Sequence, residues 1–326
     1  MTIRSGSQWI RRLRLTLKAD WTGAMLGVLV IGAGLSIASP YFFTPENLVT
    51  ILIQAAVVAI LAAGESFVIL SGHIDLSVGA VTALVGSIVG LTTVRYGLNP
   101  GIGILFGLTI GAAVGLVNGL LVTKAGLPSF IVTLAGFSLW RGLAFQITGG
   151  FDTSGMPGPI SFLGRGHLWI VPMPIIVVFG VFLISAAVLR LTRFGRYVYA
   201  IGSNAEATRL AGIRVNRYTA GTFVVSGLVA GLAAVVLIGR LDSSGGTIAT
   251  DLELDAIAAV ILGGMSLFGG RGSVWGALLG AVLVATIRNG LVLLQVSQYM
   301  QLVVVGLVIV VAVWLDVIRQ RSLARV

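Results

Sequence analysis

The sequence contains no cysteine and unusually few charged residues. Without a cysteine among its 326 residues, the chain has neither disulfides nor thiol chemistry. Charged residues make up 10% of the chain, whereas they make up about a quarter of an ordinary soluble domain. Hydrophobic residues make up 57%. The composition therefore excludes a typical soluble domain and predicts an integral membrane protein.

Motifs for nucleotide binding, metal binding and catalysis are also missing. The chain has no G-x-x-x-x-G-K-[ST] segment, so it lacks a phosphate-binding P-loop of its own. Residues 269–272 (GGRG) lack that spacing, and we interpret them as a tight turn on the inner side of the membrane. No group of histidines and carboxylates has metal-ligand spacing, and no Ser–His–Asp set can be assembled. We therefore expect a protein that is not an enzyme and binds no cofactor or metal itself.

The apolar residues fall into segments that suit membrane-crossing helices, which need about 20 residues each. The 45 glycines fit helices that pack backbone to backbone. We predict an all-α integral membrane protein with about ten transmembrane helices, of which the second, third and eighth are interrupted. The predicted helices cover residues 23–39, 46–70, 77–94, 101–123, 128–148, 170–189, 218–240, 254–268, 274–294 and 300–318.

The basic residues predict the orientation of these helices, because cytoplasmic loops carry an excess of lysine and arginine. With both termini in the cytoplasm, the outer side receives only Arg95, Arg165 and Arg240. The inner side receives Arg4, Arg11, Arg12, Arg14, Lys18, Lys124, the cluster at 190–217, Arg271, Arg319, Arg321 and Arg325. This asymmetry also explains the net charge of +10 without nucleic acid.

The same pattern divides the chain into regions. We expect a basic cytoplasmic tail at residues 1–22, a transmembrane domain at 23–318 and a second basic cytoplasmic tail at 319–326. The first apolar segment is interpreted as an uncleaved helix, with cleavage after Ala38 as the alternative. The protein is thus predicted to cross a membrane several times.

The cytoplasmic loop at 190–217 contains a short predicted helix. Ser203-x-x-Glu206 matches a capping box, and Gly212 suits the left-handed residue that ends a helix. Ala207, Leu210 and Ala211 would share one narrow apolar face. Such a helix could dock on a soluble partner, or it could be incidental to a solvated basic loop. The pattern by itself favours the second interpretation, since basic loops are common in membrane proteins. Arginines surround the helix at positions 193, 196, 209, 214 and 217.

Polar residues inside predicted helices are costly in a membrane and therefore indicate function. Gly64-Glu65-Ser66 and the segment 71–77 are predicted to break the second helix, with Asp75 and Ser77 capping the third. Glu65 could either line the translocation path or have a structural role, whereas His73 is interpreted as a packing residue. The candidates for the translocation path are Glu65, Ser66, Asn118, Arg141, Asp255, Arg288 and Asn289.

The two arginines on this path differ in their expected surroundings. Arg288 lies near the middle of a predicted helix and needs an acidic partner, for which we consider Glu65 and Asp255. Arg141 lies near the end of its helix, so its side chain could instead reach the membrane interface.

Two short segments of the chain are nearly identical. VILSG at 68–72 and VILGG at 260–264 are each followed by a break and a further apolar segment. The similarity hints at an internal duplication, as found in many transporters.

Several longer motifs together resemble the permease subunit of bacterial ATP-binding cassette importers for monosaccharides, and ribose-type permeases most of all. The resemblance covers about residues 45–318 and departs from the family pattern at His73, where many members have glycine. The motifs are GESFVILSGHIDLSVGA (64–80), TLAGFSLWRGLA (133–144), FGRYVYAIGSNAEATRLAGI (194–213), ELDAIAAVILGGMSLFGGRGSVWGALLGA (253–281) and NGLVLL (289–294).

This resemblance implies a transport assembly. The chain would form a homodimer, bind a cytoplasmic ATPase subunit that holds ATP and magnesium, and receive its substrate from a periplasmic sugar-binding protein. The substrate would pass along the dimer axis without a tight site in the permease. The short cytoplasmic helix would become the segment that couples to the ATPase, through Ser203, Asn204, Glu206, Ala207, Arg209, Leu210 and Gly212.

Two alternatives remain at this stage. The first is an ATP-binding cassette permease for branched-chain amino acids, from a related family. The second is an ion-coupled secondary transporter that uses Glu65, Asp75 and Arg288 as a relay. The sequence does not identify which sugar would be carried.

Overall fold

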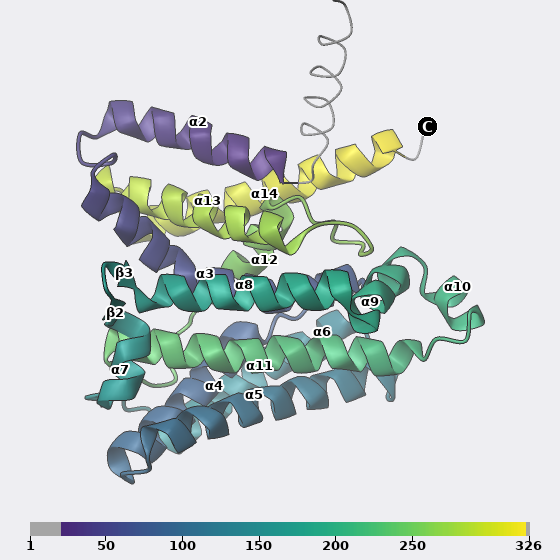
Figure 1. Cartoon of the computed structure of the whole chain (residues 1–326), viewed down its shortest axis with the longest axis horizontal. Helices are drawn as coiled ribbons and strands as arrows, with labels where there is room; N and C mark the ends of the chain where they lie inside the picture. Colours follow the sequence, from purple (N-terminus) through teal and green to yellow (C-terminus); the bar gives the residue numbers. More distant parts are fainter. Residues whose placement is uncertain (1–20, 324–326) are drawn as a thin grey trace, which may run out of the picture.

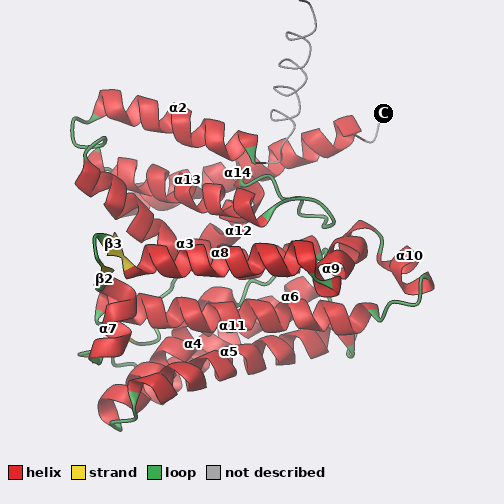
Figure 2. Cartoon of the chain, in the orientation of Figure 1, coloured by secondary structure: helices red, strands yellow, loops and turns green. Residues whose placement is uncertain are grey.

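The computed structural model describes residues 21–323. The predicted tail at 1–22 lies almost entirely outside the described residues, as does the end of the tail at 319–326. Long helices form a bundle in which they run side by side (Figure 1). Helices account for most of the described chain, and the strands are two-residue pairs in the connections (Figure 2). The all-α fold predicted from the sequence is confirmed.

The helices follow the apolar segments of the sequence. Those that coincide with predicted segments are α2 (Thr22–Ala38), α3 (Pro45–Leu70), α4 (Val78–Gly90), α5 (Pro100–Thr123), α6 (Ser129–Thr148), α8 (Met173–Leu191), α11 (Val215–Leu241), α12 (Leu252–Leu262), α13 (Val274–Leu293) and α14 (Gln298–Leu323). A π-helix at Leu91–Arg95 continues α4. The connections contain α7 (Gly158–Arg165), α9 (Arg193–Ser203), α10 (Ala205–Leu210), β1 (Thr153–Ser154), β2 (His167–Leu168), β3 (Val171–Pro172) and β4 (Ser243–Ser244).

Seven helices of the described residues are long and apolar enough to cross a membrane: α3, α4 with its π-helical end, α5, α6, α8, α11 and α13. One predicted segment is shorter than expected, because α12 has 11 residues and ends at Leu262 rather than at residue 268. Helix α2 has 17 residues, as many as predicted. Helix α12 is too short to cross a bilayer by itself, because a helix rises about 1.5 Å per residue.

Helix α11 lies at the centre of the bundle and packs against α5, α3, α4 and α7. Its contact with α5 is backbone to backbone. A Cβ atom on Gly111 of α5 would overlap the carbonyl of Gly227, and a Cβ atom on Gly227 would overlap the carbonyl of Gly111. Small residues at helix interfaces allow this approach, as is usual in membrane bundles. The glycine content thus positions the central helix.

The position of the first break differs from the prediction. Gly64, Glu65 and Ser66 do not interrupt a helix, because α3 continues to Leu70. Gly64 instead lets α3 approach α11, since a Cβ atom there would lie 3.2 Å from the Cα atom of Ser226. The break falls at residues 71–77, between α3 and α4.

Candidate functional site

Helix α10 projects from one end of the bundle, opposite to α7 (Figure 1). The predicted capping box is wrong by one residue. The N-cap is Asn204, whose Oδ1 accepts a hydrogen bond from the backbone N–H of Ala207 at 2.9 Å. The Ser203 hydroxyl donates instead to the carbonyl of Tyr199, within α9. Glu206 does not reach back to the cap and forms an ion pair with Arg209 at 2.7 Å.

The C-terminal end of α10 agrees with the prediction. Gly212 has a positive φ of 81° and its N–H donates to the carbonyl of Arg209, while the N–H of Ile213 donates to the carbonyl of Thr208. These bonds form a Schellman motif, which satisfies the last carbonyls of a helix. Leu210 is 82% exposed, an unusual position for a leucine at the tip of a projecting loop. The helix therefore presents an apolar side chain that the described residues leave uncovered.

The base of α10 is attached to the bundle through four glycines, which we call the glycine junction: Gly72, Gly202, Gly269 and Gly270. A Cβ atom on Gly269 would lie 2.8 Å from the N atom of Gly72 and 2.9 Å from the Cα atom of Gly202. The N–H of Gly270 donates to the carbonyl of Leu70 at 2.9 Å. Three segments far apart in the sequence thus contact one another through their backbones. Because no side chains lie between them, a movement of one segment directly displaces the others.

A side chain also ties α9 to the same turn. The hydroxyl of Tyr199 donates to the carbonyl of Gly272 at 2.9 Å. The turn itself is closed by the N–H of Ser266, which donates to the carbonyl of Arg271. The turn at 263–273 is therefore fixed to α9, and α9 continues through Asn204 into α10.

The two similar segments noted in the sequence end their helices in the same way. Gly72 and Gly264 have φ values of 82° and 85°. The N–H of His73 donates to the carbonyl of Val68, and the N–H of Met265 donates to the carbonyl of Val260. Both segments are thus Schellman motifs, one at the end of α3 and one at the end of α12. The glycine in each motif is required because the position is left-handed.

A buried polar cluster lies beside the first break. Glu65 accepts a hydrogen bond from the N–H of Asp75 at 3.0 Å, and Asp75 accepts from the N–H and the hydroxyl of Ser77 at 2.9 and 2.6 Å. The hydroxyl of Ser77 accepts from Asn118 at 2.9 Å. Ser77 occupies the N-cap position of α4, as predicted, but its side chain makes no capping hydrogen bond. Ser226 of α11, which the sequence analysis missed, donates to Asp75.

All of these side chains are buried, and the cluster connects α3, α4, α5 and α11. Ser66 does not join it, because its hydroxyl donates to the carbonyl of Ala62 within α3.

Arg141 of α6 has a structural partner that the sequence did not reveal. After α11 the chain runs without helix from Asp242 to Asp251, and β4 pairs with β1 there. The Arg141 guanidinium donates to the carbonyls of Gly246, Ile248 and Ala249 at 3.0, 2.6 and 3.2 Å. Non-helical backbone inside a membrane protein needs such partners. The alternative that Arg141 merely reaches for the interface is therefore unnecessary.

The carboxylate of Glu253 lies over Gly79, against which a Cβ atom would collide. Glu253 is 5% exposed, and its Oε2 atom has no hydrogen-bond partner among the described residues. Glu253 lies one residue before the helix predicted at 254–268. Its position in the first turn of a buried helix becomes clear only from the structure.

Arg288 forms an ion pair with Asp255 at 2.7 Å. Of the two partners considered from the sequence, Asp255 is confirmed and Glu65 is wrong. The neighbouring Asn289 exchanges hydrogen bonds of 2.9 and 3.0 Å with Asn47 of α3. The path candidates therefore divide into the buried cluster, the Arg141 contact and a group around Arg288.

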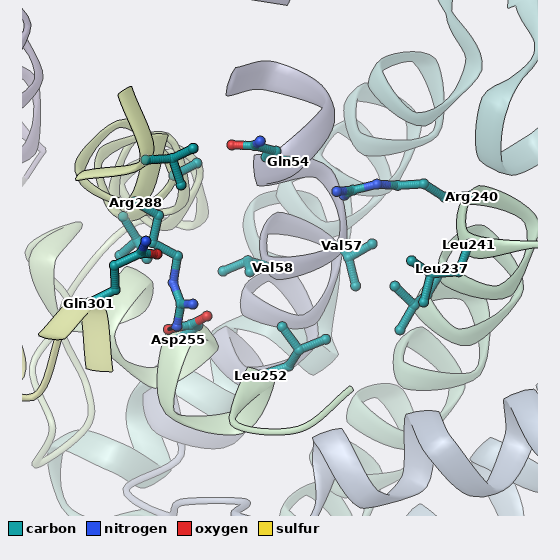
Figure 3. Close-up of a pocket in the computed structure, with 13 residues that line it drawn as sticks. Gln54, Val57, Val58, Leu237, Arg240, Leu241, Leu252, Asp255, Arg288 and Gln301 are labelled. Atoms are coloured by element: carbon teal, nitrogen blue, oxygen red, sulfur yellow. Dashed lines mark hydrogen bonds and ion pairs between the residues drawn. The ribbon is translucent and has the colours of Figure 1, made fainter. Parts of the chain in front are cut away.

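Asp255 and Arg288 line a cavity of about 310 Å³ (Figure 3), whereas Asn289 does not. Helices α3, α11, α12, α13 and α14 contribute to it. Its apolar part is formed by valines, leucines and an alanine. The polar residues are Gln54, Arg240, Asp255, Arg288 and Gln301, of which Gln54, Arg240 and Gln301 were not predicted. Single glutamines in an apolar segment carry no signal that would have identified them.

A bundle of apolar helices with polar groups at depth and an exposed short helix at one end is the architecture of a membrane transport subunit. Residues 47–313 match the family described as branched-chain amino acid transport system / permease component, and the chain belongs to this family. It is a multi-pass permease subunit of the inner membrane and not an enzyme.

Curated relatives cover most of the chain. A ribose import permease protein of Bacillus subtilis is 43% identical over 90% of this chain and 92% of its own length. The ribose import permease protein of Escherichia coli K12 is 41% identical with the same coverage. A fructose import permease protein of Rhizobium meliloti is 38% identical over 84% of this chain and 79% of its own length. No solved structure matches the chain.

Proposed function

We propose that this chain is the membrane-spanning subunit of an ATP-binding cassette importer that carries a monosaccharide, a ribose-like pentose or a hexose, into the cell. The similarity that carries the proposal is the 43% identity to a ribose import permease protein over 90% of the chain. The family description names branched-chain amino acids, whereas the relatives found over most of the chain are named for ribose, fructose, xylose and allose. A sugar is therefore preferred to an amino acid as the substrate.

The orientation belongs to the proposal as well. We place the basic loop at 190–217 and both termini in the cytoplasm, and α7 on the periplasmic side. This assignment follows the excess of basic residues at the α10 end of the bundle. About ten segments would then enter the membrane, with α12 completing its passage through the non-helical segment 242–251 that Arg141 holds.

The working assembly would contain two copies of this chain, an ATPase subunit that binds ATP and magnesium on the cytoplasmic side, and a periplasmic sugar-binding protein. Helix α10 suits the contact with the ATPase for two reasons. Leu210 is an exposed apolar anchor, and the Arg209–Glu206 ion pair flanks it with polar groups. A buried apolar residue with a polar rim is the usual anatomy of a protein interface.

The contacts of α10 suggest how ATP binding would move the helices. A displacement of α10 passes to α9, and α9 meets the end of α3 and the turn at 263–273 in the glycine junction. Each partner shifts the permease between states only by binding one state more tightly than the other. The ATPase would thus act on the two helix ends at α3 and α12 together.

Reconstitution of the complete assembly in proteoliposomes tests this function. We expect uptake of D-ribose, D-allose or D-fructose that requires ATP, the ATPase subunit and the binding protein. Uptake of L-leucine instead would favour the amino-acid alternative. Uptake that is abolished by a protonophore but proceeds without the ATPase would favour an ion-coupled secondary transporter using Glu65, Asp75 and Arg288.

A further inference from the structure

The cavity around Arg288 combines an apolar part with a polar rim (Figure 3). Its volume of about 310 Å³ lies at the lower end of the range for small-molecule sites, about 300–1,000 Å³. Gln54 and Gln301 supply carboxamides, each of which can both donate and accept hydrogen bonds. Such a combination suits a small solute with apolar C–H faces and a rim of hydroxyl groups.

The charged side chains around the cavity are held by partners within the chain. The Arg288 guanidinium is paired with Asp255, and Arg240 donates to the carbonyl of Ile53 at 3.2 Å. Each guanidinium has five N–H donors and therefore retains donors for the hydroxyl groups of a neutral solute.

The position of the cavity fits the proposed transport direction. Arg240 lies in the last turn of α11, beside α7, where a Cβ atom on Gly164 would collide with the backbone of Arg240. Arg288 lies in the second half of α13, which runs toward the same end of the bundle. In the proposed orientation this end is periplasmic, so the cavity lies where a solute released by the binding protein enters.

We propose that this cavity is a transient binding site for the transported sugar in the periplasmic half of the permease, formed by Gln54, Arg240, Asp255, Arg288 and Gln301. The proposal rests on the function proposed above and refines one expectation from the resemblance, namely that the permease has no tight site of its own. The sugar hydroxyls exchange hydrogen bonds with the carboxamides and with the Asp255–Arg288 pair. The C–H faces pack against Val57, Val58 and Leu252.

The absence of cysteine from the chain allows a direct test. In the complete complex, Leu252→Cys places a thiol in the cavity lining, and Leu254→Cys places one on the same helix outside it. A small hydrophilic methanethiosulfonate reagent reacts with a thiolate that water can reach. D-ribose, D-allose and D-fructose are added without the binding protein. Val292→Cys, a second lining position that is more exposed, serves if Leu252→Cys does not assemble.

At a sugar concentration about ten times the dissociation constant, labelling of the cavity thiol should be slowed about tenfold. Labelling at Leu254→Cys should not change. Adding Gln54→Leu should remove the protection, whereas Gln146→Leu, on an exposed face of α6 outside the cavity, should retain it.

The outcomes separate this proposal from the function on which it rests. No protection by any of the three sugars at either lining thiol, in a complex that imports one of them, would overturn the cavity site and leave the function standing. Lining thiols that the reagent never reaches would overturn it too. Protection by L-leucine together with leucine uptake would overturn both.

Discussion

Replacing Gly202 with alanine should uncouple ATP hydrolysis from sugar transport. The new methyl group would overlap the carbonyl oxygen of Leu70 and lie 2.5 Å from the N atom of Gly270. These neighbours are backbone atoms, so they cannot rotate away as a flexible side chain would. The three segments of the glycine junction must therefore separate, and the hydrogen bond from Gly270 to Leu70 must lengthen.

The size of the effect follows from these contacts. Inserting a methyl group into a well-packed site costs about 1–3 kcal/mol, and weakening the hydrogen bond costs about 1 kcal/mol more. Gly202 lies within α9, so the better helix propensity of alanine returns about 1 kcal/mol. The net cost is about 2 kcal/mol, which corresponds to a factor of about 30 in an equilibrium between two states.

The assay is the ratio of sugar imported to ATP hydrolysed in proteoliposomes, together with stimulation of the ATPase by the loaded binding protein. We expect Gly202→Ala to lower both by about 10- to 30-fold while the complex still assembles. The matched control is Gly180→Ala, because this helical glycine on α8 has no neighbouring atom within 4 Å of the place where a Cβ atom would lie. A Gly202→Ala complex with normal coupling would refute the role of the glycine junction.

Three further predictions concern other parts of the chain. Gly212→Pro and Ala207→Glu should each leave membrane insertion intact but abolish stimulation of the ATPase; normal coupled uptake in both would remove α10 from the mechanism. Arg141→Lys should lower the midpoint of thermal unfolding, measured by size-exclusion chromatography after heating. The reason is that an ammonium group cannot reproduce the hydrogen bonds of the planar guanidinium to three carbonyl oxygens. An unchanged midpoint would contradict this role of Arg141. Asp255→Asn should lower the free energy of unfolding by about 1–3 kcal/mol, since it leaves Arg288 poorly paired. The Asp255→Leu, Arg288→Leu double variant should recover part of this loss. Equal losses in the single and double variants would count against the pairing.

The helices could be predicted from the sequence because apolar segments of suitable length leave few other structures in a membrane. Their interruptions could be predicted only in part: the break at residues 71–77 was expected and is present, whereas Gly64, Glu65 and Ser66 lie within a continuous helix. Glu65 remains in a regular helix because the N–H of Asp75, ten residues later, supplies a partner for its carboxylate. Partners supplied by a distant part of the chain are not visible in a local pattern.

The candidate site divides in the same way. The end of α10 was predictable because a left-handed glycine is a local signal. Its start was predicted wrongly, because Ser203 was chosen as the cap and the adjacent Asn204 is the residue that caps the helix. The ion pair of Arg288 with Asp255 was one of two possibilities, and packing decided it. The cavity was missed because its glutamines become significant only when several helices bring them together.

The two Schellman motifs suggest why a single short helix can control the whole permease. Both α3 and α12 end at the α10 side of the bundle, and the turn that follows α12 is fixed to α9 through the junction and Tyr199. Helix α12 is 11 residues long and therefore about 16 Å in length. Its opposite half carries Leu252 and Asp255, which line the cavity. A displacement at the junction is thus delivered to the cavity by one rigid helix.

The link from the glycine junction through α12 to the cavity leads to a prediction that neither the junction nor the cavity gives by itself. Trapping the ATPase in its closed state with ATP and vanadate should change the rate at which the thiol of Leu252→Cys is labelled. The same treatment should have little effect when Gly202→Ala is present, because the loosened junction no longer passes the displacement to α12. If trapping alters labelling equally with and without Gly202→Ala, the closure reaches the cavity by another route, and α12 is not the connecting element.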